Sequence, residues 1–461
     1  MNRRSNGHLP ASREDPNLAP PTESQPLLAR LIPRSIHPDG ESGRSGFHTL
    51  HFVRVLWRSS NQVSSAVNLL WPFSVLAVIM HFATTDLDLW VFAISYVGMI
   101  PAANLLGFAG QEFARKMPKV AGILIETTFG SIIEILLFLI LIIKHRSAPS
   151  EGAAENGNLI PIIQAAILGS ILTNLLLCLG LCFVMGGIRQ QSQKFHAAVS
   201  EVGNSLLLVA GFGLSATTQS ETPPHQGFTE KKLEHDILGI SRITSIFLVA
   251  AFAMYLWYNA ITNHSIFDEV LEQDEHNDLD HHDDLSKPKF TLTECAIAIT
   301  SSVILVTVLA VFLVNRIGEV VEAGIPDQFL GLILLPLVEK AAEHLTAIDE
   351  AWDGQMNFAL YHCLGPSIQT ALLNAPLVVI VGWILGKPMD LNFEIFMIVM
   401  LVMSIIVVGN FLRDGESNAL EGGLLAVVYF IISTAAWYYP DPDVATSNGF
   451  LDATVLAKAS I

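Results

Sequence analysis

The feature that most constrains this chain is a series of apolar runs between residues 67 and 439. A helix needs about 20 apolar residues to cross the roughly 30 Å hydrocarbon core of a bilayer. Because backbone groups in lipid must satisfy their own hydrogen bonds, such runs are expected to be helices. The runs predict an all-α polytopic membrane protein with about eleven transmembrane helices, at residues 67–83, 89–110, 120–143, 160–187, 197–218, 240–262, 294–315, 328–348, 358–385, 393–412 and 419–439.

Composition supports the same class of protein. Hydrophobic residues make up 51% of the 461 residues and charged residues only 15%, whereas a soluble chain carries charges at about a quarter of its positions. The net charge of −18 comes largely from one hydrophilic segment and the two ends, so it does not indicate a basic partner. We therefore expect membrane lipid around the chain, no nucleic-acid partner, no enzymatic chemistry and no cofactor.

The cysteines show no pattern typical of a disulfide framework or a zinc site. All of them fall within apolar segments, at Cys178, Cys182, Cys295 and Cys363. Their interpretation from sequence is as small buried hydrophobic residues.

One predicted span contains ionisable residues where they are costly. The stretch LLPLVEKAAEHLTAIDE (334–350) places Glu339, Lys340, Glu343 and His344 in otherwise apolar surroundings. A charge at the centre of a spanning helix costs about 2.5 to 3.5 kcal/mol, so such groups usually pair or line a polar pathway. Glu339 and Glu343 are four residues apart and share a helix face. This stretch predicts an ion or proton site.

A second span repeats the pattern. The stretch AGILIETTFGSIIEILLFLI (121–140) carries Glu126 and Glu134. If Glu134 is aligned with Glu343, Gly130 corresponds to Glu339 and Ser131 to Lys340. The alignment suggests an internal repeat, and repeat-built transporters place their sites where corresponding helices of two halves meet. Two unrelated spans, each with one buried glutamate, are the alternative.

The order of spans predicts two halves of five helices each. Five is odd, so the halves are expected to run through the membrane in opposite senses, as an inverted repeat. The predicted segments are a disordered cytosolic tail (1–52), the first span and start of repeat 1 (53–110), repeat 1 (89–262), an acidic linker with histidines (263–290), repeat 2 (291–440) and a C-terminal tail (441–461). Arginines before the first span favour a cytosolic N-terminus. The linker is either a solvated connector or a low-affinity cation or pH sensor.

Each half has a further polar segment after its glutamate span. The first is GSILTNLLLCLG (169–180), with Ser170, Thr173 and Asn174, and the second is GPSIQTALLNAP (365–376), with Ser367, Gln369, Thr370 and Asn374. Hydroxyl, amide and freed main-chain oxygens beside carboxylates are ligands for a hard cation. Small polar residues also pack spanning helices together, so a purely structural role is the alternative.

At these motifs the chain resembles the cation/proton exchanger family, of the vacuolar calcium/proton exchanger type within the calcium/cation antiporter superfamily. The resemblance implies a Gly-Asn-Ala-x-Glu motif in each half, whose glutamate binds both cation and proton; Glu134 and Glu343 match these glutamates. Ser131 stands in place of the first asparagine, and Glu339 and Lys340 replace the second Gly-Asn pair. In these departures the chain is similar to the divergent fungal branch, which implies low-affinity sodium or potassium exchange at the vacuole.

We therefore expect a proton-coupled antiporter of a vacuolar or other endomembrane, with Glu134 and Glu343 binding the transported cation and H⁺. An ammonium at Lys340 would leave a net charge suited to Na⁺ or K⁺, unless Lys340 pairs with Glu339 and faces away from the site. Calcium or manganese exchange, a transport-inactive paralogue and a channel are the alternatives. The further site candidates are Glu126, Ser131, Ser170, Asn174, Glu339, Lys340, His344, Ser367 and Gln369.

Overall fold

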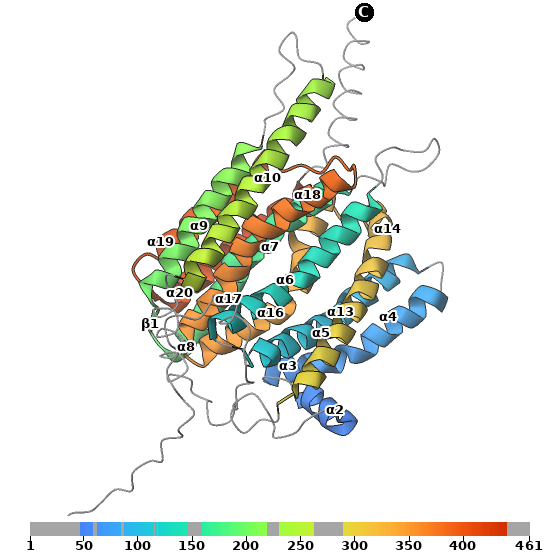
Figure 1. The fold of residues 1–461 in the computed structure, drawn as a ribbon, viewed down its shortest axis with the longest axis vertical. Coiled ribbons are helices and arrows are strands. Elements are labelled where there is room, and N and C mark those ends of the chain that lie inside the picture. Colours follow the sequence, from blue (N-terminus) through green and yellow to red (C-terminus); the bar gives the residue numbers. More distant parts are fainter. Residues whose placement is uncertain are drawn as a thin grey trace, which may run out of the picture. The chain divides into compact units, whose positions relative to one another are not determined.

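A computed structural model describes residues 47–58, 62–83, 87–114, 116–117, 119–145, 159–218, 230–261 and 289–439. Most of the predicted tail, nearly all of the acidic linker and the C-terminal segment lie outside these residues. All described elements belong to one compact unit, residues 37–461, and they are helices apart from two short strands (Figure 1).

The helices fall into a leading group and two sets. The leading group is α2 (Thr49–Arg58), α3 (Gln62–Val67), the 3₁₀ turn η2 (Asn68–Leu70) and α4 (Trp71–Ala83). The first set is α5 (Asp88–Ala114), α6 (Lys119–Lys144), α7 (Ile160–Leu172), the π-helical turn η3 (Thr173–Cys178), α8 (Leu179–Arg189), α9 (Ala197–Ala216) and α10 (Glu230–Ile261). The second set is α13 (Leu292–Asn315), α14 (Ile317–Glu322), α15 (Asp327–Phe329), the π-helical turn η4 (Leu330–Leu334), α16 (Leu335–Trp352), α17 (Met356–Gln369), the π-helical turn η5 (Thr370–Asn374), α18 (Ala375–Ile384), α19 (Ile395–Phe411) and α20 (Ala419–Tyr438).

Every predicted span coincides with a helix or with consecutive helical segments. Among the described residues, eight helical stretches are long and apolar enough to cross a membrane. They include α5, α10, α13, α20 and the two stretches interrupted by π-turns, α7–α8 and α17–α18. The all-α polytopic fold class is confirmed, whereas membrane crossing by α6, α16 and the shorter α19 stays a prediction.

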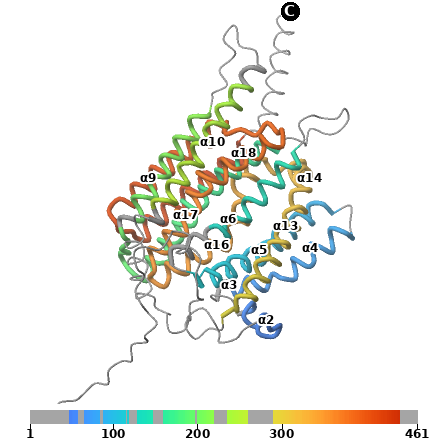
Figure 2. The backbone as a smooth tube through the Cα atoms, viewed as in Figure 1, coloured from blue at the N-terminus to red at the C-terminus, as the bar shows by residue number. Residues whose placement is uncertain are grey.

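Contacts between the two sets come in reciprocal pairs. Helix α8 packs on α20 while α18 packs on α10, and α7 packs on α19 while α17 packs on α9. The corresponding first helices, α5 and α13, pack directly on each other. Such reciprocity is typical of two halves related by a two-fold axis. In Figure 2 the teal α6 accordingly lies beside the orange α16 and α17, although these helices are far from α6 in the sequence.

Local chemistry sets several helix ends. Thr291 caps α13 in a capping box, accepting from the Glu294 amide at 3.2 Å while Glu294 accepts from the Thr291 amide at 3.1 Å. Helix α18 ends in a Schellman turn, where Gly386 has a φ of +68° and the Lys387 amide donates to the Gly382 carbonyl at 2.8 Å.

The last residues of the predicted tail are helical. Helix α2 begins at Thr49, and the His51 imidazole lies 3.1 Å from the Glu294 carboxylate. The Phe52 ring stacks on Phe290 at a centroid distance of 5.2 Å. Residues 47–52 therefore pack on the start of α13. The predicted boundary of the disordered tail, residue 52, is too late, and the tail can end no later than residue 46.

The described residues include two short strands that the sequence did not predict. Strand β1 (Gln193–Lys194), after α8, pairs antiparallel with β2 (Glu416–Ser417), before α20. This short pairing joins the two sets at one end.

Candidate functional site

Two π-helical turns, η3 and η5, lie where the sequence placed its polar interruptions. Turns η3 and η5 begin at Thr173 and Thr370, which correspond to each other if Ser170 is aligned with Ser367. A third turn, η4, precedes α16, and Tyr96 donates to its Leu334 carbonyl at 2.8 Å. A π-turn leaves main-chain groups outside the regular ladder, and such turns are frequent at functional sites.

Glu134 is the centre of the polar cluster. It is fully buried on α6, and both carboxylate oxygens accept from the Thr370 hydroxyl at 2.8 Å. The Asn374 amide nitrogen donates to Oε2 at 3.2 Å. Both donors belong to η5, so a glutamate from one half is held by the other half.

Lys340 joins the two glutamates of the repeat. Its Nζ lies 3.0 Å from Glu134 Oε2 and 3.4 Å from Glu343 Oε2. The Lys340 side chain is fully buried and that of Glu343 is 13% exposed. Lys340 therefore faces the cluster rather than away from it. An ammonium shared by two carboxylates has a compensating charge on each side, which a buried charge needs.

Small residues make room for this arrangement. Gly130 on α6 stands opposite Glu343, and a Cβ at this position would lie 1.9 Å from Glu343 Oε1. The residue of α16 that aligns with Gly130 is Glu339, which is 1% exposed. Among the described residues neither of its oxygens has a hydrogen-bond partner, and it interacts electrostatically with Glu134, Lys340 and Glu343. At this aligned position the first half therefore has a glycine without a side chain, and the second half has a third carboxylate.

Several of the remaining candidates lie close to the residues of this cluster. Asn174 in η3 lies 2.9 Å from the His344 ring, and its amide nitrogen has no partner within the described part of the chain. The Ser170 hydroxyl lies 3.5 Å from that of Thr370. Ser131 is buried beside Gly130 with its hydroxyl unpartnered.

Two candidates on α17 make no hydrogen bond to the carboxylates among the described residues. The Ser367 hydroxyl donates to the Cys363 carbonyl of its own helix at 2.9 Å, so its proton is not donated to a carboxylate. Gln369 is buried at the end of α17. The side chain of Glu126 lies outside the described part of the chain.

Thr370 and Asn374, whose side chains donate to Glu134, belong to the second polar segment that the sequence indicated, but they were not selected as site candidates. The Ser-x-x-Thr spacing shared by residues 170–173 and 367–370 could have identified Thr370. Thr173, its counterpart, lies 3.3 Å from the Tyr429 hydroxyl. Only the crossing of α6 over η5 shows that Thr370 rather than Ser367 reaches the carboxylate.

The buried cluster carries three carboxylates, from Glu134, Glu339 and Glu343, and one ammonium, from Lys340. Unpaired negative charge is costly away from water, so a proton or a cation entering the cluster would be held by the excess charge. Hydroxyl and amide oxygens nearby are neutral ligands of the kind that hard cations use. The chemistry available here is reversible binding of protons or cations.

Comparisons with known proteins agree with this chemistry. The model of the sodium/calcium exchanger protein family matches residues 87–261 and 295–438. The chain is 32% identical over 386 residues to vacuolar cation/proton exchanger 5 of Arabidopsis thaliana, covering 82% of each chain. It is 32% identical to the vacuolar calcium ion transporter of Schizosaccharomyces pombe, covering 76% of this chain and 79% of that one.

A solved structure shares the fold. The crystal structure of the Ca²⁺/H⁺ antiporter protein YfkE superimposes with a TM-score of 0.62 at 23% identity, covering 82% of this chain and 99% of that chain.

Proposed function

Since the chain belongs to the sodium/calcium exchanger family, we propose that it exchanges protons for an inorganic cation across an acidic organelle membrane. Relatives named as a vacuolar cation/proton exchanger and a vacuolar calcium ion transporter favour the vacuole. The N-terminus lies in the cytosol, lumenal protons drive the exchange, and no covalent chemistry takes part.

The observation that carries this proposal is the position of the Lys340 ammonium between Glu134 and Glu343, at 3.0 and 3.4 Å. A tethered positive charge already sits where the two glutamates of the repeat meet. A transported cation must share these carboxylates with it, and a proton bound by a carboxylate removes the charge that holds the cation. Cation binding and proton binding therefore exclude each other. This mutual exclusion is the coupling that an exchanger requires.

The two halves supply the movement. Glu134 comes from one half and its donors Thr370 and Asn374 from the other, so the cluster is complete only while α6 and η5 are together. Rocking of one half against the other opens the site to each side in turn, as in other repeat-built transporters.

We infer that the transported ion is monovalent, Na⁺ or K⁺, as in the fungal branch that the altered motif resembles. Lys340 contributes one permanent positive charge, and Glu339, without a hydrogen-bond donor, is neutral in this proposal because an unpaired buried carboxylate is costly. Glu134, Glu343 and Lys340 then sum to a single negative charge. One monovalent cation or one proton neutralises that charge.

Calcium/proton exchange is the second candidate. The oxygens of Glu134, Glu343 and Thr370 are hard ligands that suit Ca²⁺. If Glu339 is ionised instead, the cluster carries two negative charges and matches a divalent ion.

A flux assay in vesicles separates these functions. Purified protein is reconstituted with a pH-sensitive dye inside, and Na⁺, K⁺, Ca²⁺ and Mn²⁺ gradients are applied in parallel. We expect K⁺ or Na⁺ to drive proton movement. Cation flux without accompanying proton movement would indicate a channel, and no flux with any of the four ions would indicate an inactive paralogue; either result contradicts the proposal.

Two variants test the carboxylates in the same assay. Glu134→Gln and Glu343→Gln keep the side-chain shape but cannot carry an exchangeable proton, so each is expected to reduce exchange to the level of empty vesicles. Glu319→Gln, at a 41% exposed carboxylate outside the cluster, is the matched control and retains parental rates. Proton-coupled flux in a well-folded Glu134→Gln or Glu343→Gln protein would contradict the assignment.

A further inference from the structure

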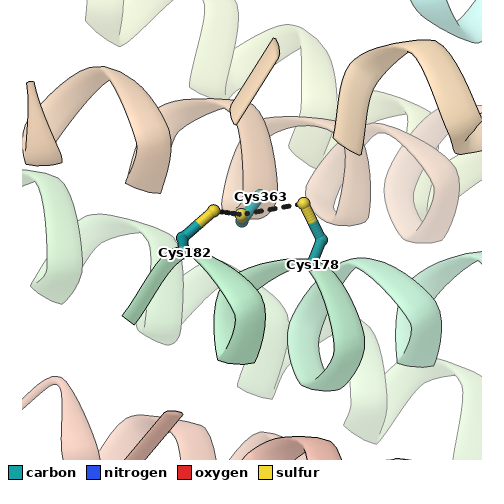
Figure 3. Close-up of side chains that lie close together, drawn as sticks. All are labelled: Cys178, Cys182 and Cys363. Carbon is teal, nitrogen blue, oxygen red and sulfur yellow. Dashed lines mark hydrogen bonds between the residues drawn. The ribbon is translucent and has the colours of Figure 1, made fainter. Parts of the chain in front are cut away.

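Three cysteines from the two halves meet in the interior. Cys178 ends η3, Cys182 follows one turn later on α8, and Cys363 comes from α17. In Figure 3 the Cys363 sulfur lies between the other two. Its Sγ is 3.5 Å from Cys178 Sγ and 3.9 Å from Cys182 Sγ. All three residues are fully buried.

We propose that Cys178, Cys182 and Cys363 form a binding site for one soft, thiophilic metal ion of the class that includes Cu⁺, Zn²⁺ and Cd²⁺. The site is separate from the carboxylate cluster and takes a different class of ion. Sulfur ligands select soft ions, whereas Na⁺, K⁺ and Ca²⁺ bind oxygen.

The sulfur geometry carries the proposal. Three sulfurs at about 2.3 Å from a common centre, spaced at 120°, lie about 4.0 Å from one another. Here the three sulfurs all lie within 4.8 Å of one another, with two separations of 3.5 and 3.9 Å. One ion therefore fits between them after shifts of a few tenths of an ångström.

The helix register explains why the sulfurs converge. Cys178 and Cys182 are four residues apart and so share one helix face. Helix α17 packs against both η3 and α8, which brings Cys363 to that face. On binding, the ion forms metal–sulfur bonds, and each thiol that becomes a thiolate releases its proton to solvent.

The site would also link the halves of the molecule. Cys178 and Cys182 belong to the first set of helices and Cys363 to the second, and Cys178 lies close enough to Glu343 to interact with it electrostatically. An ion bound by all three sulfurs would resist the separation of α17 from α8. Exchange through the neighbouring carboxylate cluster is then expected to slow.

The binding test uses the full chain, purified in detergent, fully reduced and titrated with Cd²⁺ alone. We expect one Cd²⁺ per chain with thiolate-to-metal charge-transfer absorption in the ultraviolet, a signature that carboxylate binding does not produce. Cys363→Ser should weaken this binding by about tenfold or more. Cys295→Ser, a buried cysteine of α13 outside the cluster, is the matched control and should leave it unchanged.

A titration without charge-transfer absorption, or with the same affinity in Cys363→Ser as in the parent, would overturn the site. Cys182→Ser provides a second variant if Cys363→Ser does not fold, and thermal unfolding reports on folding in each case. This binding test does not depend on the proposed transport, so the two can fail separately.

The link between the halves has its own readout and rests on the proposed exchange. Vesicles equilibrated with Cd²⁺ should show slower exchange in the parent and in Cys295→Ser, but not in Cys363→Ser. Equal slowing in all three proteins would place the Cd²⁺ effect elsewhere and contradict the link.

Discussion

Lys340 is the residue whose position most affects the choice of ion. Its ammonium lies within 3.4 Å of carboxylates from both halves, so it belongs to the site and is not a partner of Glu339 alone. A unit charge about 6 Å from a bound ion, at an effective dielectric constant of about 20, changes binding by about 3 kcal/mol per unit of ion charge. The effect on a divalent ion is twice that on a monovalent ion.

We therefore expect the double substitution Glu339→Gly, Lys340→Asn to move selectivity toward Ca²⁺. It removes the ammonium and returns a neutral amide oxygen, while the loss of Glu339, which is neutral in the proposed charge state, removes no negative charge. The measurement is Ca²⁺/H⁺ against K⁺/H⁺ and Na⁺/H⁺ exchange in the variant and its parent, with Ser131→Asn added as a third change. An unchanged preference in a folded protein would show that Lys340 does not set ion selectivity.

Asp390 is a second residue with a measurable role, in the loop between α18 and α19. Its Oδ1 accepts from the Gln164 side chain at 2.7 Å and from the Asn392 amide at 3.0 Å. Burial raises the pKa of Asp390 from 3.8 to about 6, and the two hydrogen bonds oppose this rise. The folded state therefore holds the Asp390 proton more tightly than the unfolded state does. This stabilising contribution is present below about pH 4 and is lost as the pH rises through about 6.

Asp390→Asn should remove that pH dependence. Between pH 4.5 and pH 7.5 the parent is expected to lose about 2 kcal/mol more stability than the variant. Thermal unfolding of both proteins in detergent at the two pH values measures the difference. Parallel pH profiles would mean that Asp390 is ionised in the folded protein as readily as in the unfolded chain.

At the scale of elements, close helix contacts hold the π-turns beside the site. A Cβ on Gly169 of α7 would lie 2.2 Å from the Leu332 carbonyl oxygen in η4. The obstacle is backbone, which cannot rotate away as a side-chain end can. Contact between α7 and η4 therefore depends on glycine at this position.

Gly169→Ala should destabilise the protein by about 1 to 3 kcal/mol, the usual effect of forcing extra volume into a packed interior. Gly423→Ala is the control, because a Cβ at that position in α20 meets nothing within 4 Å, and alanine is the better helix former by up to about 1 kcal/mol. Thermal unfolding and exchange rates are compared for both. Equal stability of the two variants would show that α7 and η4 can separate without cost.

At the scale of the whole molecule, truncation can test where the folded part of the chain begins. Residues before 47 have the composition of a segment unable to form a core, whereas α2 packs on α13 through His51 and Phe52.

Deletion of residues 2–46 is expected to leave exchange and thermal stability unchanged. Deletion of residues 2–58 should lower stability by about 1 to 3 kcal/mol, because Glu294 loses its His51 partner and Phe290 loses its stacked ring. Both truncations are compared with the full chain in detergent and in vesicles. A stable 2–58 deletion would show that α2 contributes nothing to the folded state.

The sequence by itself determined where the long apolar helices form, because apolar runs of spanning length and polar interruptions are local properties of the chain. It also predicted a site at Glu134 and Glu343 and a repeat that relates them, since a glutamate in an apolar run stands out without knowledge of its neighbours; the structure places both glutamates beside Lys340. The same local information located the interrupted spans that became η3 and η5.

Only the tertiary structure decided which side chains meet. Thr370 rather than Ser367 reaches Glu134, and Cys363 joins two cysteines some 180 residues away in sequence, at separations of 181 and 185 positions. Such partnerships depend on how helices from opposite halves cross and on the register that each π-turn imposes. The spacing of residues along one helix specifies its faces, but the neighbour of a face is fixed by packing between helices distant in sequence.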